Sequence, residues 1–186
     1  GDHTCAILDD RSLKCWGDNG DGQLGIDSGD ESKNSPQDVP FTDYIVAVSL
    51  GESHSCVITD DKDVRCWGDN TYGQLGDGTT IERIAPTNIY LGSGRTAIAV
   101  SAGEAHTCAV LDDGSMKCWG DNSNGQLGDG SDTSSLSPIR SRLGGGDTSI
   151  SVSSGSYHTC ALTDDRLVKC WGDNWHGQLG TGNNID

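Results

Sequence analysis

The sequence predicts an all-β protein made of four tandem repeat units, each folding as a four-stranded antiparallel sheet of the blade type. The segment HTCAILDDRSLKCWGDNGDGQLG at 3–25 recurs three more times, and the leading histidines of the copies lie 51, 52 and 52 positions apart. This period is too long for the common helical solenoids and fits a blade of four strands. With 27 glycines and only 33% hydrophobic residues, the chain lacks the apolar side chains for one thick core or for long amphipathic helices. We therefore expect a single repeat domain, 1–186, with units at about 1–44, 45–96, 97–148 and 149–186.

Each copy contains a predicted β-hairpin. In the third copy, 106–111 and 115–119 alternate small or apolar residues with polar ones, and Asp112-Asp113-Gly114 between them is typical of a turn. Placing Cys108 opposite Cys118 leaves a three-residue loop that ends at Gly114, which can adopt the positive φ that such a loop requires. The other copies have Arg11, Lys62 or Arg166 at this position. We expect mild strain or a different turn there, because these side chains disfavour the left-handed region.

Two further strands complete each predicted sheet. A β-rich run ending in glycine precedes each later copy, at 45–51, 98–103 and 150–155. A weaker strand follows each QLG turn, around Pro36, Pro86 and Pro138. Proline is tolerated there only in an outer strand, which can leave one backbone donor unpaired.

The charge balance excludes some classes of partner. The chain carries 28 acidic against 12 basic residues, a net charge of −16, so we expect no binding to nucleic acid or to anionic membranes. No apolar run is long enough to cross a bilayer, so we expect no membrane insertion. The opening GDHTC has neither an initiator Met nor a signal-peptide core, which suggests a mature or excised piece.

The four copies closely resemble the repeat of the regulator of chromosome condensation family, in which G-x-x-H-T-x-A-L and W-G-x-N-x-x-G-Q-L-G mark each blade. The matching strings here include HTCAVLDDGSMKCWGDNSNGQLG and HTCALTDDRLVKCWGDNWHGQLG, and the resemblance covers nearly the whole chain. It implies a seven-bladed β-propeller of four-stranded blades, a ring that four units cannot close. Three interpretations stay open: an excerpt of a longer propeller, a polymer or filament that continues from chain to chain, and a closed four-bladed form.

The eight cysteines form four pairs, each ten residues apart, and the hairpin register places the members of a pair directly opposite each other. We expect disulfides, an oxidising compartment and hence an extracellular protein, secreted or on the cell surface. Zinc held by His3 with Cys5 and Cys15, or reduced buried thiols, are the alternatives, but each repeat offers too few ligands for a structural zinc site. The predicted pairs are Cys5 with Cys15, Cys56 with Cys66, Cys108 with Cys118, and Cys160 with Cys170.

The repeated histidines and tryptophans are predicted to be structural. A catalytic site is normally asymmetric, whereas His3, His54, His106 and His158 occupy equivalent positions, so we expect buried imidazoles bonded to neighbouring backbone. Each hairpin tryptophan follows a cysteine, so its indole points to the opposite face of the sheet and can fill the space between blades. These residues are Trp16, Trp67, Trp119 and Trp171, whereas Trp175 occurs in only one copy and is predicted to be exposed. The aspartate pairs in the hairpin turns are interpreted as turn formers rather than catalytic or calcium-binding carboxylates.

These observations favour a non-catalytic extracellular scaffold or protein-interaction module, which meets a protein partner or itself through blade edges and loops. We identify no catalytic residue, no metal site and no cofactor motif. One alternative is a secreted propeller that binds a carbohydrate or inhibits an enzyme, with a glycan as partner. A guanine-nucleotide exchange factor, the activity of the founding family member on the Ran GTPase, fits less well, because disulfide-spaced cysteines and strong acidity do not suit a nuclear, chromatin-bound protein.

Overall fold

The computed structural model describes residues 1–26, 29, 31–144 and 148–185, and every regular element among them is a β-strand. The strands form four antiparallel sheets, ordered β1-β2-β3, β4-β5-β6-β7, β8-β9-β10-β11 and β12-β13-β14. Their bounds are β1 His3–Ile7, β2 Leu13–Gly17, β3 Lys33–Asp38, β4 Ile45–Leu50, β5 His54–Thr59, β6 Val64–Gly68, β7 Arg83–Ile89, β8 Ala97–Ala102, β9 His106–Leu111, β10 Met116–Gly120, β11 Ser135–Arg140, β12 Ser149–Ser154, β13 His158–Thr163 and β14 Val168–Gly172.

The central hairpin of each sheet has the register that the cysteine spacing predicts. In β9 and β10, Cys108 lies opposite Cys118, and the Leu111 amide donates to the Ser115 carbonyl at 2.8 Å. The last turn residue has a positive φ in all four hairpins: 75° at Gly114, and 64°, 65° and 68° at Arg11, Lys62 and Arg166. The three cationic residues thus adopt the left-handed conformation rather than a different turn, at a conformational cost.

The strands predicted on either side of the hairpins are confirmed. The strands upstream of the later hairpins, β4, β8 and β12, each pair with the first hairpin strand and contain one register irregularity near their start. The strands that contain Pro36, Pro86 and Pro138 are β3, β7 and β11, and each forms the opposite edge of its sheet. Proline occurs at an edge because its missing N–H then leaves no gap in a central ladder.

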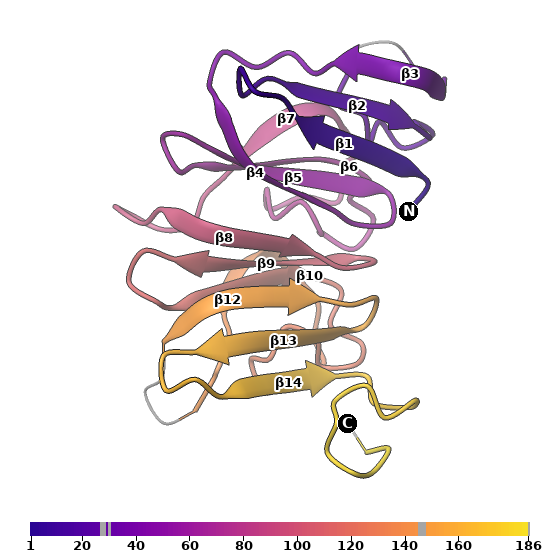
Figure 1. Ribbon diagram of the computed structural model, residues 1–186. Helices are drawn as coiled ribbons and strands as arrows, with labels where there is room; N and C mark the ends of the chain where they lie inside the picture. The colour runs from indigo at the N-terminus through magenta and orange to yellow at the C-terminus, as the bar shows by residue number, and fades with distance from the viewer. Residues whose placement is uncertain (27–28, 30, 145–147, 186) are drawn as a thin grey trace.

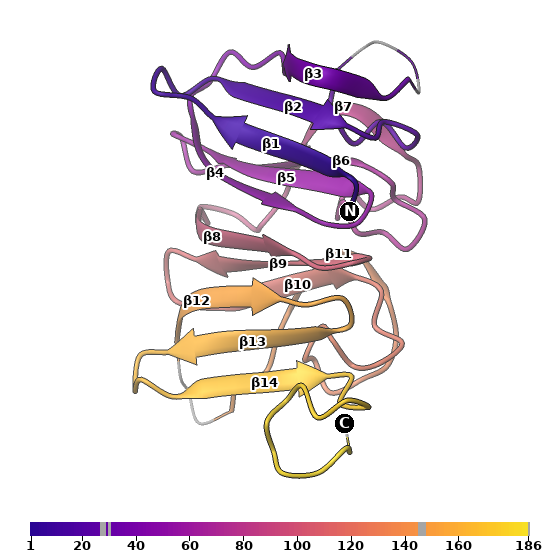
Figure 2. The ribbon, with the colours of Figure 1, turned by 45° about the vertical axis from the view of Figure 1, so that its right-hand side comes forward.

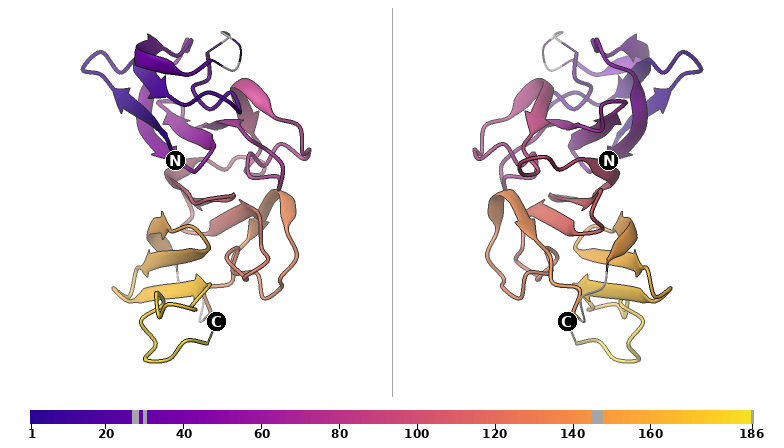
Figure 3. Two further views of the ribbon diagram at one scale, coloured as in Figure 1. Left: turned by 90° about the vertical axis from the view of Figure 1, so that its right-hand side faces the viewer. Right: turned by 90° about the vertical axis from the view of Figure 1, so that its left-hand side faces the viewer.

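The four sheets follow one another in chain order, with β1–β3 at one end of the molecule and β12–β14 at the other (Figures 1 and 2). Side views show that the first and last sheets do not meet, so the array is open (Figure 3). Strands β4, β8 and β12 contact one another from sheet to sheet, which makes them the inner strands of the array. No helix in the described part of the chain is long and apolar enough to cross a membrane.

The apolar core is divided among the interfaces between successive sheets, which we call joints. The described residues form three buried clusters, one in each joint, and each combines residues from two neighbouring sheets. The cluster of the second joint includes Cys56, Cys66 and Leu75 from one sheet and Ala109 and Trp119 from the next. Each sheet is therefore stabilised mainly by its neighbours, as in other repeat proteins.

Candidate functional site: the joints and the turn face

All eight cysteines are paired within hairpins. The structure has the bonds Cys5–Cys15, Cys56–Cys66, Cys108–Cys118 and Cys160–Cys170, each with a Cα–Cα distance of 4.1 Å. This short distance is typical of the non-hydrogen-bonded pairs of an antiparallel ladder, where side chains lie closest together. Every disulfide therefore closes one hairpin, and none connects two sheets.

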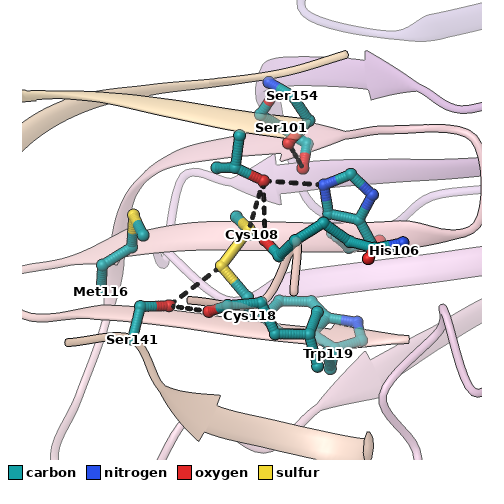
Figure 4. The surroundings of a disulfide bond; sticks show 12 residues. Ser101, His106, Cys108, Met116, Cys118, Trp119, Ser141 and Ser154 are labelled. Atoms are coloured by element: carbon teal, nitrogen blue, oxygen red, sulfur yellow. Dashed lines mark hydrogen bonds between the residues drawn. A yellow bond between two sulfur atoms is a disulfide. The ribbon is translucent and has the colours of Figure 1, made fainter. Parts of the chain in front are cut away.

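The disulfides and the tryptophans meet in the joints from opposite sides. The sulfurs of one sheet face the following sheet, and the indole of the following sheet faces back, so that Trp119 packs in the same cluster as Cys56 and Cys66. Trp67 and Trp119 are fully buried, whereas Trp16 in the first sheet and Trp171 in the last are half-buried. Figure 4 shows the Cys108–Cys118 bridge between β9 and β10, with the Ser141 hydroxyl 3.2 Å from the sulfur of Cys118.

A chain of hydrogen bonds crosses each joint. In the second joint the Gln74 carbonyl accepts from the Trp119 indole at 2.9 Å and from the Thr107 hydroxyl at 2.8 Å. The same hydroxyl lies 2.8 Å from Nε2 of His54, which belongs to the same sheet as Gln74. We call this set of four residues a lock. It joins two sheets through groups that are all buried.

The lock is repeated in the other two joints with nearly the same distances. In the first joint, the distances are 2.8 Å from His3 to Ser55, 2.8 Å from Ser55 to the Gln23 carbonyl and 2.9 Å from Trp67 to that carbonyl. In the third joint, the distances from His106 to Thr159, from Thr159 to the Gln126 carbonyl and from Trp171 to that carbonyl are all 2.9 Å. The histidine and hydroxyl of a lock lie 52 or 53 residues apart, about one repeat period.

The histidines therefore bond differently from the sequence prediction. We expected the imidazoles to bond neighbouring backbone, but Nε2 of His54 bonds the side-chain hydroxyl of the next sheet. The expectation was wrong because the hydroxyl reaches the histidine only across the joint, a contact that the pattern of one hairpin does not contain. His158, in the last sheet, is only half-buried.

Two members of the lock, the hydroxyl and the glutamine carbonyl, were not predicted from the sequence. The residue that follows each repeated histidine is always Thr or Ser, as in HTC and HSC, and the glutamine of GQLG is present in every copy. The Thr or Ser that follows every repeated histidine was the signal from which the hydroxyl of the lock could have been predicted. The glutamine gave no such signal, because its backbone carbonyl accepts the bonds.

The lock fixes the tautomer of the imidazole. A backbone carbonyl can only accept, so the single proton of the Thr107 hydroxyl is donated to Gln74, and the hydroxyl oxygen accepts from the imidazole. Nε2 of His54 consequently carries the proton, and Nδ1 is an unprotonated acceptor. Nδ1 is buried without a hydrogen-bond partner in His3, His54 and His106.

Burial suppresses protonation of the lock histidines. Desolvation is the main cause, and it lowers the pKa of His54 to about 3 and the pKa of His3 and of His106 to about 4. The joints thus hold neutral imidazoles at neutral pH.

One glycine shows how closely the sheets approach. A Cβ on Gly76, which follows the QL of the second copy, would lie 2.7 Å from the Trp119 ring, and Gly76 has a φ of 80°. Gly25 and Gly128 have the same relation to Trp67 and Trp171. The final glycine of GQLG is therefore required by the indole of the next sheet as well as by the turn.

The aspartate pairs of the hairpin turns bond the backbone, as expected of turn formers. In the three later turns, the first aspartate of the pair accepts from the backbone ahead of the adjacent inner strand, as Asp112 does from the Thr96 amide at 3.2 Å. In the first, third and fourth turns, the second aspartate accepts from the backbone of its own turn, as Asp113 does from the Ser115 amide at 3.0 Å. Bonds to Ser115 lower the pKa of Asp113 below its ordinary value.

The four hairpin turns lie on one side of the array, and we call this surface the turn face (Figure 1). It consists of 8–12, 59–63, 111–115 and 163–167, and each turn contains an aspartate pair and no more than one cation. The turn face therefore has net negative charge, which Arg95 reduces at the third turn by pairing with Asp112 and Asp113. Trp175 lies in the loop after β14 and is 76% exposed. Among the described residues, no three His, Cys, Asp or Glu side chains are grouped so that they could hold a metal ion.

Comparisons with known proteins agree with this architecture. Two family models described as Regulator of chromosome condensation (RCC1) repeat match the chain, one at 1–23, 45–74, 97–126 and 150–178, the other at 15–58, 63–110 and 113–162. The Ultraviolet-B receptor UVR8 of Arabidopsis thaliana is 33% identical over 186 residues, which is 99% of this chain and 42% of the receptor. The human probable E3 ubiquitin-protein ligase HERC3 is 36% identical over 97% of this chain and 17% of its own length.

Solved structures show the same fold. Human WBSCR16 superposes with a TM-score of 0.86 at 26% identity, covering 98% of this chain and 47% of that one. Prp20p from Saccharomyces cerevisiae, whose structure was described together with its binding to Gsp1p and histones, gives a TM-score of 0.84 at 25% identity, covering 100% of this chain and 46% of Prp20p. The chain thus spans less than half the length of each of these relatives.

Proposed function

Because the chain belongs to the family of regulator of chromosome condensation repeat proteins, we propose that it is a non-catalytic module that binds a protein partner in an extracellular setting. The pairing of all eight cysteines carries the proposal. Disulfides form and persist in oxidising compartments, and reducing compartments keep thiols free. The first three disulfides also pack in the clusters of the joints, and Cys56, Cys66, Cys108 and Cys118 are fully buried there.

The turn face is the surface that we assign to the partner. Its carboxylates are exposed, and in three turns the second aspartate is held by its own turn; these bonds also lower the pKa of Asp10 and Asp165. A rigid row of negative charge is complementary to a partner with basic side chains, which it would attract over a distance of about 10 Å at moderate salt. Repetition from sheet to sheet would let one partner contact several turns at once.

Thiol labelling of the protein isolated from its source tests the setting. Iodoacetamide added without reductant should leave the intact mass unchanged, and after reduction it should label all the cysteines. Labelling of native protein without reductant would contradict the proposal.

Charge reversal tests the binding surface. Asp9→Lys and Asp61→Lys, both at exposed turn positions, should weaken capture of the partner from a cell-surface or secreted fraction. Asp132→Lys changes the charge by the same amount at an exposed loop away from the turn face, so it should leave capture unchanged. Equal effects of all three reversals would show that the turn face has no special part.

A second candidate function, self-association, is favoured by the end sheets of the array. The first sheet presents the hydroxyl of Thr4 and the half-buried indole of Trp16, whereas the last presents the half-buried His158 and the carbonyl of Gln178. These are the two halves of a lock, so a second copy could join head to tail.

Two variants and their mixture test self-association of the 186-residue chain. Trp16→Ala removes one half of the lock and His158→Ala the other, so each variant should be monomeric by light scattering, while an equimolar mixture should form heterodimers. A parent chain that stays monomeric at about 100 μM, where weak interfaces associate, would refute this candidate.

A further inference from the structure

The locks hold neutral histidines whose Nδ1 is buried without a hydrogen-bond partner. His54 uses Nε2–H to bond Thr107, so a proton added to the ring would have to reside on Nδ1. This nitrogen has no hydrogen-bond partner, and a Cβ on the neighbouring Gly51 would lie 2.3 Å from it. The backbone of Gly51 therefore packs against this edge of the ring.

The third joint has the same construction. Nε2 of His106 bonds Thr159, Nδ1 is buried without a partner, and a Cβ on Gly103 would lie 2.5 Å from Nδ1. In the first joint, His3 bonds Ser55 and its Nδ1 is likewise buried and unpartnered. An imidazolium at His3 or His54 would be a buried charge with an unsatisfied donor, which is strongly unfavourable, whereas at His106 the backbone of Ser156 offsets part of the same cost of burial.

Charged groups near the rings do not remove this penalty. Desolvation dominates at His54, where Asp69 favours the charged form and His106 and His3 oppose it. Desolvation also dominates at His106, where Asp121 and the backbone of Ser156 favour the charged form and His158 opposes it.

His3 has a similar balance. Desolvation is again the largest cause of its lowered pKa; the N-terminal amine opposes the charged form and Asp18 favours it. No lock histidine has a carboxylate bonded to its Nδ1 within the described residues.

We propose that mild acid opens the joints of this array, because His3, His54 and His106 can accept a proton only when their locks separate. The disulfides lie within hairpins, so they would hold each sheet together while neighbouring sheets come apart. In acid, the disulfide-closed hairpins would thus stay folded while the joints between the sheets open. Acid would open the joints in this way whichever protein binds the turn face.

The sign of the effect follows from the pKa values. The folded pKa of each lock histidine lies below its ordinary value of 6.5, so between about pH 6.5 and 4 the opened state binds more protons than the closed state. The closed state is fully favoured above pH 6.5 and loses stability as the pH falls. Aspartates with a lowered pKa, such as Asp77 and Asp129, add their effect mainly below their ordinary value of 3.8. The interval from pH 6 to 4.5 therefore reports mainly on histidine.

The proposal is tested by measuring the unfolding equilibrium in urea by tryptophan fluorescence between pH 8 and 4.5, without reductant. For each pH unit by which the pH falls, one lock histidine should decrease the folding equilibrium constant by about tenfold. Three lock histidines together should therefore decrease it by up to about a thousandfold per pH unit. His54→Gln keeps an N–H donor for Thr107 but cannot titrate. In this variant the folding equilibrium constant should therefore decrease by up to about a hundredfold per pH unit instead of a thousandfold. His176→Gln, at an exposed histidine, should leave the pH dependence of the parent chain unchanged. A parent chain whose stability is constant from pH 7 to 4.5, or a His54→Gln variant that keeps the full dependence, would overturn the proposal.

Two measurements on the parent chain keep the proposal testable if His54→Gln does not fold. The imidazole Cε1–H signals of His54 and His106 should show no titration above pH 5 in NMR spectra, and titration near pH 6.5 would overturn the proposal. At pH 4.5 to 5, small-angle scattering should show a longer particle that keeps its far-ultraviolet strand signal and has no free thiols. Loss of the strand signal together with the compact shape would show that acid unfolds the hairpins instead of opening the joints.

Discussion

Thr107→Val would remove the hydroxyl at the centre of the second lock while preserving the shape of the side chain. Two hydrogen bonds are lost, the one from His54 at 2.8 Å and the one to the Gln74 carbonyl at 2.8 Å. The carbonyl keeps the Trp119 indole as donor, but Nε2–H of His54 is left buried without an acceptor. An unsatisfied buried donor costs about 1–3 kcal/mol and a lost hydrogen bond about 1 kcal/mol, so we expect a destabilisation of about 2–4 kcal/mol.

The chain supplies a matched control for this substitution. Thr4 occupies the same strand position in the first sheet, but it is exposed. Urea unfolding at pH 7.5 with the disulfides intact should show a lower midpoint for Thr107→Val and no change for Thr4→Val. Ordinary surface changes alter the unfolding free energy by no more than about 0.5 kcal/mol. If the unfolding free energy of Thr107→Val lies within this range of the parent chain, or equals that of Thr4→Val, the lock does not stabilise the joint.

Three further predictions concern the turns, the disulfides and the close approach of the sheets. Lys62→Gly should raise the unfolding free energy by about 0.5–1 kcal/mol in the same assay, because glycine relieves the φ of 65° by more than it adds to the entropy of the unfolded chain; a lower midpoint would contradict this. Removing the second disulfide by Cys56→Ala with Cys66→Ala should cost about 2–3 kcal/mol, the value for a short closed loop, and added reductant should then have a smaller effect than in the parent chain. Gly76→Ala should lower the melting temperature far more than Gly94→Ala, since both sites have positive φ but only Gly76 faces an indole, and equal losses would exclude the clash as the cause.

The sequence was sufficient to predict the structure within a sheet. Cys108 and Cys118 lie ten residues apart around a turn, so pairing them fixes the register of the whole hairpin and the position of Gly114. These contacts are local, and the periodicity of a strand and the chemistry of a turn determine them. The same logic placed the prolines on edge strands, because a central ladder cannot accommodate them.

The joints could not be predicted in the same way. His54 and Thr107 meet only because two whole sheets pack at a particular distance and angle, which no pattern within one repeat specifies. The hydroxyl was visible in the sequence but had no assigned partner. The acceptor was hidden altogether, since the Gln74 carbonyl belongs to the backbone and is identified only by its position in space.

The lock explains why a repeat period of about 52 residues can accommodate variable connections. Its members lie at the ends of the hairpin strands and in the GQLG turn, as His54 and Gln74 do, whereas the segment from that turn to the outer strand lies outside the joint. The asparagine of the preceding turn holds this segment through its side-chain amide, as Asn19 does at Gly29, Asn70 at 77–82 and Asn122 at 129–134. A change of length in this segment alters the outer loop without moving the histidine, hydroxyl or carbonyl of the lock. Variation can thus accumulate on the outer surface while the joints keep their geometry, the arrangement required of a scaffold whose loops bind different partners.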